Sequence, residues 1–396
     1  MSEIRVNSIG NESNTGGPVL SGITTFSGQQ YFIPPKGTTE ERPTDCPPGS
    51  IRFNTDTSTL EYWAGDVWLE FEASSNEFGL HQTATTFALG DSGGLGTRGV
   101  FSAIGGYPTI SNVQNYISVE STGNAVDFGD LTFPTRYGNA IGSSTRGIVY
   151  EGITSSSTYD TDIQHFTFAT TGSSIDFGAN SSVGRYGAIA TSNSTRGIRA
   201  GGFTPGANTN NIEYITIASS ATASKDFGDL IVAFRYGNGC FASSTRGIVT
   251  AGYPGSGTSN HIGYITFSTE GDAQDFGDLA VAKNAGSQGG SNATRGIFVG
   301  GHNGSAVTDE LEFITMASTG NGVDFGNLTG GTTQYGATAS SKTRLVIAMG
   351  NYPSYVDTID YVQINTTGNS LDFGNLDVTG GDSGTHCGAS NGHGGL

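Results

Sequence analysis

Arginine and aspartate recur at regular intervals along the chain and are the first candidates for binding chemistry. Each arginine follows a threonine, with successive Thr-Arg pairs 48 to 50 residues apart, and each aspartate begins an Asp-Phe-Gly triplet of similar spacing. Because a guanidinium fork can bind a carboxylate, we predict structural Arg–Asp pairs rather than a ring of anion-binding groups. The arginines are Arg98, Arg146, Arg196, Arg246, Arg295 and Arg344, and the aspartates are Asp127, Asp176, Asp226, Asp275, Asp324 and Asp372.

Metal or thiol chemistry would require histidines or cysteines at close spacing. Cys46, Cys240 and Cys387 stand at unrelated positions, and the nearest histidine pair, His386 and His393, lies in a glycine-rich tail. Neither arrangement matches a metal-binding motif or a disulfide framework. We therefore expect free thiols, no metal site and no cofactor.

Cleavage of a polysaccharide would require two carboxylates about 5 to 10 Å apart in one cleft. The recurring aspartates occupy equivalent positions in successive repeats, so the symmetry of the repeat should keep them apart. We predict no catalytic residues and a protein that is not an enzyme. An enzyme acting on polysaccharide stays an alternative, because a fold does not decide a function.

Aromatic side chains follow or precede the glycine-containing turns of the repeat and are the candidate ligand-binding groups. Such groups on rigid loops can stack on sugars or anchor a protein partner, although each could instead cap its own repeat. Those after the second strand of a repeat are Tyr107, Phe203, Tyr253, His302 and Tyr352, and those before the next first strand are Phe133 and Phe234.

These candidates must be positioned by a repeating unit of about 49 residues. One unit contains four short strand-like segments, RYGNGCFASS, TRGIVTAGY, HIGYITFST and the segment that begins with Asp-Phe-Gly, separated by turn residues. Glycine stands at 63 and charged residues at 13%, which is typical of turn-rich all-β proteins. Both alternation phases of the third segment are apolar, so we expect sheets covered on both faces.

The charge balance bears on partners and location. The net charge is −18, and only 17 Lys and Arg are spread along the chain, so nucleic-acid binding is not expected. The N-terminal residues lack a secretory signal pattern, and no 18-residue apolar run occurs, so no membrane insertion is expected.

The succession Arg-Tyr-Gly, Thr-Arg-Gly-Ile, Gly-Gly and Ile-x-Tyr resembles the kelch repeat over residues 81–396. The resemblance implies an all-β, kelch-like β-propeller of six or seven four-stranded blades. The kelch tryptophan is absent, and the phenylalanines of the Asp-Phe-Gly triplets should take its packing role. A C-terminal strand could close seven blades with strands from residues 51–80, which we slightly favour. It could instead close six, leaving residues 51–80 as a separate hairpin module.

Residues 1–50 are rich in Gly, Asn, Ser, Thr and Pro and predict an irregular, extended arm. This segment resembles N-terminal segments of structural proteins of tailed cyanophages, and GSIRFNTDTSTLEYWAGDVWLEF resembles a hairpin module of phage tail-fibre proteins. The resemblance implies a virion protein, assembled in the host cytoplasm, whose arm binds other virion proteins. A tail fibre or surface adhesin for host attachment, binding a host-surface glycan or protein as a receptor, is the main hypothesis. A capsid-decorating or architectural protein is the alternative, and a homotrimer is a plausible assembly.

Overall fold

The computed structural model divides the chain into two compact units, Met1–His81 and Gln82–Leu396. It describes residues 34–57, 59–70, 98–105, 110–154, 159–220, 222–331, 333–348, 350, 354–377 and 387–396. Every regular element of these residues is a β-strand, which confirms the all-β prediction. No helix of the described residues is long and apolar enough to cross a membrane.

The described part of the first unit is one small sheet with the order β1-β2-β3-β4. Its strands are β1 (Lys36–Gly37), β2 (Ile51–Asn54), β3 (Thr59–Trp63) and β4 (Trp68–Glu70). Buried Glu61 forms an ion pair with Arg42 and accepts a 2.7 Å hydrogen bond from Asn54 Nδ2. Because Lys36–Gly37 and Arg42 belong to this unit, the predicted boundary at residue 50 falls within it.

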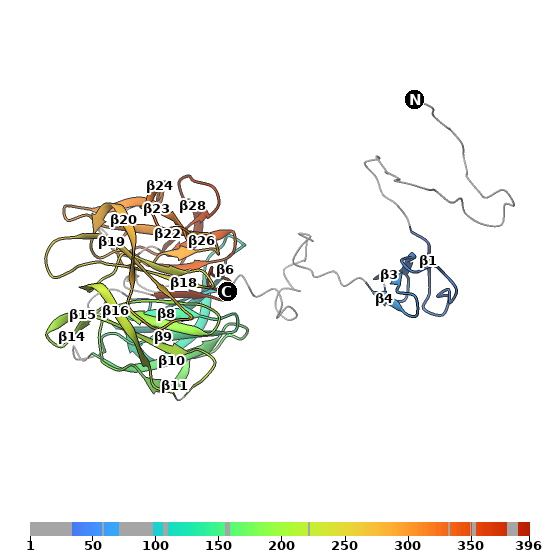
Figure 1. Cartoon of the computed structure of the whole chain (residues 1–396), viewed down its shortest axis with the longest axis horizontal. Coiled ribbons are helices and arrows are strands. Elements are labelled where there is room, and N and C mark those ends of the chain that lie inside the picture. Colours follow the sequence, from blue (N-terminus) through green and yellow to red (C-terminus); the bar gives the residue numbers. More distant parts are fainter. Residues whose placement is uncertain are drawn as a thin grey trace, which may run out of the picture. The chain divides into compact units, whose positions relative to one another are not determined.

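The described part of the second unit (Figure 1) consists of six antiparallel sheets, five with four strands and one, sheet 3, with a fifth short strand. Sheet 1 contains β29 (Cys387–Ser390), β5 (Arg98–Ser102), β6 (Ser111–Ser118) and β7 (Val126–Thr135). Sheet 2 contains β8 (Asn139–Gly142), β9 (Arg146–Tyr150), β10 (Asp162–Thr167) and β11 (Ile175–Asn180). Sheet 3 contains β12 (Ile189–Ser192), β13 (Arg196–Ala200), β15 (Ala207–Thr216) and β16 (Lys225–Phe234), and β14 (Phe203–Thr204) also pairs with β15.

The other three sheets repeat this pattern. Sheet 4 contains β17 (Cys240–Ala242), β18 (Arg246–Thr250), β19 (Ser259–Thr266) and β20 (Gln274–Lys283). Sheet 5 contains β21 (Gly290–Ser291), β22 (Arg295–His302), β23 (Val307–Thr315) and β24 (Val323–Asn327). Sheet 6 contains β25 (Ala337–Ser340), β26 (Arg344–Ala348), β27 (Thr358–Gln363) and β28 (Leu371–Asn375).

The first strands of the six sheets contact one another in a closed order. Strand β8 lies against β12, then β17, β21, β25 and β29 follow, and β29 returns to β8. The six sheets are therefore consistent with a β-propeller-like arrangement around these first strands.

The last described strand, β29, pairs with β5, the first described strand of the second unit. Cys387 lies opposite Ser102 and Ser390 opposite Gly99, so β29 completes sheet 1. Strands β2, β3 and β4 pair with β1 instead. The sequence slightly favours a seventh sheet made of the C-terminal strand and strands from residues 51–80. The described strands do not form this sheet, because β29 pairs with β5.

The recurring arginines join each sheet to the next. In every case Nη1 donates to a backbone carbonyl that lies just after the third strand of the following sheet, at 2.6 to 3.2 Å. The last arginine, Arg344, bonds Val119 of sheet 1, so the series closes on itself. The donor–acceptor pairs are Arg98–Phe168, Arg146–Ile217, Arg196–Phe267, Arg246–Met316, Arg295–Ile364 and Arg344–Val119.

The predicted Arg–Asp pairs are therefore wrong. All twelve residues lie in the described part of the chain, and no ion pair joins any of these arginines to any of these aspartates. The aspartates Asp127, Asp176, Asp226, Asp275, Asp324 and Asp372 are all exposed on edge strands, where water solvates them. A carbonyl beyond the end of a strand needs a donor, and the guanidinium supplies it.

Five of the six sheets also stack three side chains in series. In sheet 4 the guanidinium of Arg246 lies 4.7 Å from the centroid of the Tyr264 ring, and this ring meets Phe276 edge-on at 6.0 Å. Sheets 1, 3, 5 and 6 repeat the stack, starting from Arg98, Arg196, Arg295 and Arg344. The phenylalanines of the Asp-Phe-Gly triplets are 0% to 3% exposed, which confirms their packing role: Phe128, Phe177, Phe227, Phe276, Phe325 and Phe373.

The glycine of the triplet allows neighbouring sheets to approach closely. Gly228 has a φ of 149°, and a Cβ on it would lie 2.4 Å from the backbone of Gly271 in the next sheet. At the same contact Gly271 N donates a 2.7 Å hydrogen bond to Phe227 O. A side chain at this position would separate the two sheets.

Replacing Arg295 by Ala should lower the free energy of unfolding by about 1 to 3 kcal/mol, because Ile364 O loses its donor and Phe313 its cation–π partner. Denaturant unfolding of the whole chain measures the loss. The matched control is Asp324→Ala in the same sheet, which should stay within about 0.5 kcal/mol of the parent. Equal losses in the two variants would favour an Arg–Asp pair instead.

Deleting residues 380–396 should lower the melting temperature of the second unit sharply. The deletion removes β29, so β5 becomes an unpaired edge and the closed order of first strands is interrupted. Thermal unfolding followed by circular dichroism measures the effect. A truncated chain that melts like the full-length protein would show that β29 is dispensable.

Candidate functional site

Four tyrosines gather where the first strands of four sheets begin. Each stands in a Tyr-Gly pair just before its strand, and all four are half-buried. Tyr137, Tyr236 and Tyr335 have φ of 55° to 59°, an uncommon backbone conformation for a residue with a side chain. With Tyr186 they form the tyrosine cluster, in which ring centroids lie 5.4 to 5.9 Å apart. Because the tyrosines come from different sheets, only the ring arrangement brings them together.

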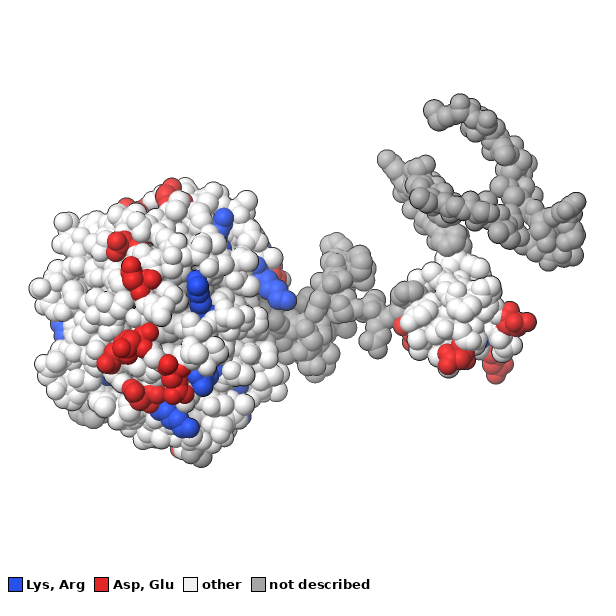
Figure 2. Space-filling view, viewed as in Figure 1, with Lys and Arg blue, Asp and Glu red and all other residues white. Residues whose placement is uncertain are grey.

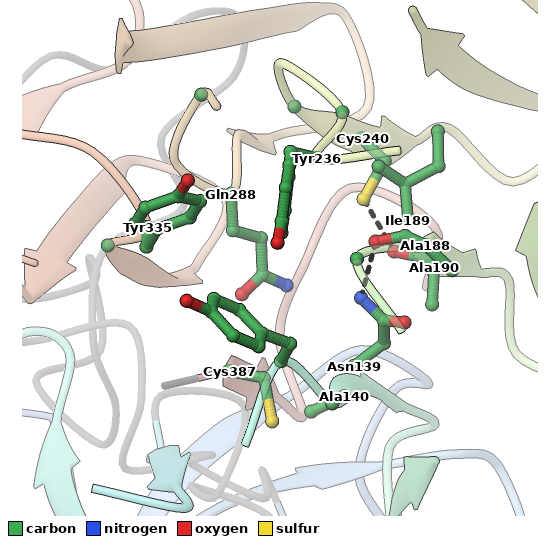
Figure 3. Close-up of a pocket in the computed structure, with 17 residues that line it drawn as sticks. Asn139, Ala140, Ala188, Ile189, Ala190, Tyr236, Cys240, Gln288, Tyr335 and Cys387 are labelled. Atoms are coloured by element: carbon green, nitrogen blue, oxygen red, sulfur yellow. Dashed lines mark hydrogen bonds between the residues drawn. The ribbon is translucent and has the colours of Figure 1, made fainter. Parts of the chain in front are cut away.

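Tyr137, Tyr236 and Tyr335 of the tyrosine cluster border a cavity of about 80 Å³, the central cavity. Figure 3 shows Tyr236, Tyr335 and Gln288 directed into the same space, with Asn139, Cys240 and Cys387 around it. Glycines from several first-strand starts complete the lining, which keeps the backbone close to the cavity.

Two amides at the central cavity are held by backbone groups. Gln288 donates to Gly388 O at 2.8 Å and accepts from Gly388 N at 2.9 Å, so it joins sheet 5 to sheet 1. Asn139 donates to Ala188 O at 2.8 Å, whereas its buried Oδ1 has no hydrogen-bond partner among the described residues. Both amides therefore join the starts of different sheets.

Four titratable groups that line the central cavity, Tyr236, Tyr335, Cys240 and Cys387, hold their protons near pH 7. Burial, together with the neighbouring tyrosines, raises the pKa of Tyr236 and of Tyr335 above the usual value. Burial also raises the pKa of the thiols of Cys240 and Cys387 to about 12. No carboxylate, histidine, lysine or arginine lies among the described residues that line this cavity. The cavity can thus supply aromatic faces and neutral hydrogen bonds.

A second cavity of about 50 Å³ lies beyond Gln288 and is lined by serines of four first strands. The C-terminal residues pack against it: His393 Nε2 lies 2.7 Å from Gly142 O, and Gly394 N donates to Ser291 O at 2.9 Å. Burial lowers the pKa of His393. His393, one of the two histidines near the C-terminus, thus packs against the first strands. The other, His386, lies outside the described residues.

Two of the predicted ligand-binding aromatics lie beside the tyrosine cluster. The guanidinium of Arg235 is 4.7 Å from the Phe203 ring centroid and 4.9 Å from that of Tyr253. Phe203 also packs against Tyr186 at 5.5 Å. The structure therefore brings Phe203 and Tyr253 together through Arg235.

The other predicted aromatics lie elsewhere. Phe133 is 39% exposed on β7, and His302 accepts a 3.0 Å hydrogen bond from Gly304 N through Nδ1. Phe234 is 1% exposed and packs in a hydrophobic core under Gly201, so its assignment as a ligand-binding residue is wrong. The sequence places Phe234 in a loop before the next strand. In the structure it is the last residue of β16, and its side chain packs with apolar residues of sheets 3 and 4. Tyr107 and Tyr352 lie outside the described residues.

Sequence reasoning missed the tyrosine cluster. Its signal was present, because Tyr-Gly recurs at residues 137, 186, 236 and 335, each time just before a first strand. The sequence predicts these residues as parts of a strand, whereas Tyr137, Tyr236 and Tyr335 adopt a left-handed backbone that only the three-dimensional structure shows.

A buried charged network supports Tyr186 from below. Arg185 Nη2 lies 2.5 Å from Glu213 Oε1, and Oε2 of Glu213 accepts hydrogen bonds from Ser182 and Ser224. Burial alone would raise the pKa of Glu213, but Arg185 and Arg199 lower it to about 2. Glu213 therefore stays ionised and holds Arg185, the residue before Tyr186, in place.

Comparison with known proteins adds no relative. No protein-family model matches the chain, and no curated protein matches it. The class that the structure defines is an all-β protein of four-stranded antiparallel sheets.

Replacing Glu213 by Gln should lower stability at neutral pH and change its dependence on acid. The pKa of Glu213 is lower in the folded chain than the ordinary value near 4.5, so its stabilising effect is complete above pH 4.5 and lost as the pH falls toward 2. The stability difference between parent and E213Q should be on the order of 3 kcal/mol at pH 7 and shrink toward pH 2.

Urea unfolding at a series of pH values measures this difference. The control is Glu270→Gln, which removes a glutamate that also lies near an arginine, 3.5 Å from Arg196, but is half exposed. Because water screens this pair, the control should change stability much less than E213Q. A constant difference between parent and E213Q across the acid range would contradict the ionised state of Glu213.

Proposed function

We propose that the chain is a structural protein of a phage virion, a tail fibre or surface adhesin whose kelch-like β-propeller binds a host-surface glycan. The observation that carries the binding function is the tyrosine cluster at the central cavity. Aromatic faces beside neutral hydrogen-bonding groups are the composition that recognises sugars, in which apolar ring faces alternate with hydroxyls.

The kelch-like β-propeller is supported by the closed order of first strands and by the repeated stack within sheets. Six four-stranded sheets recur at the period of the Thr-Arg and Asp-Phe-Gly markers. The C-terminal strand completes the first sheet, so that β5 has a hydrogen-bonded partner and is not left as an unpaired edge.

Binding is favoured over catalysis by the state of the lining groups. Tyr236, Tyr335 and the two thiols of the central cavity hold their protons near pH 7, and the described lining has no acid–base pair. A propeller enzyme acting on polysaccharide would need two carboxylates at one cleft, so it stays the weaker alternative.

The virion role rests on the N-terminal resemblance. The described part of the tail-fibre-like module forms its own sheet, β1 to β4, and the second unit presents an independent surface. Figure 2 shows acidic side chains and scattered Lys and Arg on the viewed face of the second unit, with no single basic patch. We propose that residues 1–50 bind other virion proteins, that the particle carries the chain as a homotrimer, and that the second unit contacts the host.

A capsid-decorating or architectural protein is the second candidate. The observation that favours it is the second cavity, where His393 and Gly394 bond to first strands and fill space that a ligand would otherwise enter. In such a role the six sheets would serve as a rigid display body.

Replacing Tyr137, Tyr236 and Tyr335 together by Ala should weaken attachment of the full chain to host cells or to purified host glycans by 10-fold or more. Aromatic anchors at an interface commonly contribute about 1 to 4 kcal/mol each, so three should dominate the affinity. Cell adsorption and glycan binding by surface plasmon resonance measure the loss.

The control is Ile231→Ala, which removes an exposed apolar side chain of β16 outside the central cavity. Melting temperatures of both variants separate a lost contact from lost structure. Normal attachment by a folded triple variant would reject the tyrosine cluster and favour the architectural role, whereas release of sugars from a host polysaccharide would favour the enzyme.

A further inference from the structure

Three carboxylates meet in sheet 2, where the chain passes from β9 to β10. Glu151, Asp160 and Asp162 form this acidic cluster, in which one carboxylate oxygen of each residue lies within 4.8 Å of the others. The backbone fixes their positions, because Glu151 N donates to Asp162 O and Asp160 N to Gly152 O, both at 3.1 Å. The cluster is thus held by strand ends.

Glu151 is fully buried, at 0% exposure. Its Oε1 accepts a 2.6 Å hydrogen bond from Gln164, but its buried Oε2 has no hydrogen-bond partner among the described residues. A buried carboxylate oxygen without a donor costs free energy. The fold does not require an acid here, since the residue directly after the second strand is Gly201 in sheet 3 and Ala251 in sheet 4.

Among the described residues, no basic side chain forms an ion pair with the acidic cluster. Arg199 is the nearest candidate, but its Nη2 donates to the backbone oxygens of Glu151 and Arg185.

We propose that the acidic cluster binds a Ca²⁺ ion through Glu151, Asp160 and Asp162. Three hard oxygen donors favour Ca²⁺ or Mg²⁺ over softer metals. Ca²⁺ accepts irregular sets of carboxylate oxygens, whereas Mg²⁺ demands near-ideal octahedral geometry and loses its water reluctantly, so Ca²⁺ is the ion that we choose. The three carboxylate oxygens, all within 4.8 Å of one another, are close enough together to share one cation. Asp160 and Asp162 are half-buried, so water can complete the coordination.

The ion would lie at a junction of three sheets. Gln164, which bonds Glu151, also donates to Phe133 O of sheet 1 at 3.0 Å, and Arg199 of sheet 3 bonds the Glu151 carbonyl at 2.7 Å. Ca²⁺ binding to the folded chain should therefore stabilise the second unit, because a ligand that binds only the folded state shifts the unfolding equilibrium.

The test uses the full chain, stripped of metal with EDTA and titrated with CaCl₂ by isothermal calorimetry. We expect one saturable Ca²⁺ site per chain and a higher melting temperature with CaCl₂ than with EDTA. The variant Glu151→Gln/Asp160→Asn should lose at least 10-fold in Ca²⁺ affinity and the shift in melting temperature.

A matched variant tests whether the effect is merely that of net charge. Asp324→Asn/Asp372→Asn removes the same two charges from exposed positions and should bind Ca²⁺ like the parent. Circular dichroism in EDTA checks folding, and the single variant Asp160→Asn carries the test if the double variant does not fold. Absence of saturable Ca²⁺ binding, equal losses in both double variants, or tighter binding of MgCl₂ than of CaCl₂ would each overturn the proposal.

Discussion

The bond from a recurring arginine to a carbonyl of the next sheet is the interaction on which the second unit depends. Six such bonds run from sheet to sheet, and Arg344 returns to Val119, so each sheet is held by both neighbours. A neutral carbonyl is a suitable partner, because the guanidinium stays partly hydrated and no carboxylate has to be desolvated. The aromatic ring beneath most of these arginines fixes the direction of the fork.

This arrangement also explains why the candidate binding groups lie at the centre. Because the first strands contact one another in a closed order, their starting ends lie close together. The residues just before these strands therefore surround the central cavity. The tyrosine cluster forms there from residues separated by about one repeat or more in sequence. Its position follows from closure of the ring, and its chemistry follows from the choice of tyrosine at a left-handed backbone position.

Departures from the repeat mark places where a single sheet differs in chemistry. Glu151 replaces the small residue found after the second strand in neighbouring sheets, and it brings a buried carboxylate next to two further acids. Glu213, by contrast, is buried with Arg185 and Arg199, which compensate its charge. Two buried glutamates in adjacent sheets thus differ in whether a protein cation faces them.

The sequence by itself determined the all-β class, the period and the packing role of the phenylalanines, because the repeat places the same residues in the same local environment each time. Only the tertiary structure decided the partners of those residues. The acceptor of each arginine lies about 70 residues away, or back at the start of the ring for Arg344, so local spacing pointed to the nearer aspartates.

Closure of the first-strand order, burial of Phe234 and assembly of the tyrosine cluster are likewise contacts between segments far apart in sequence, whereas the acidic cluster forms within one connection between two strands. A repeat pattern shows which residues are equivalent, but not which of them meet.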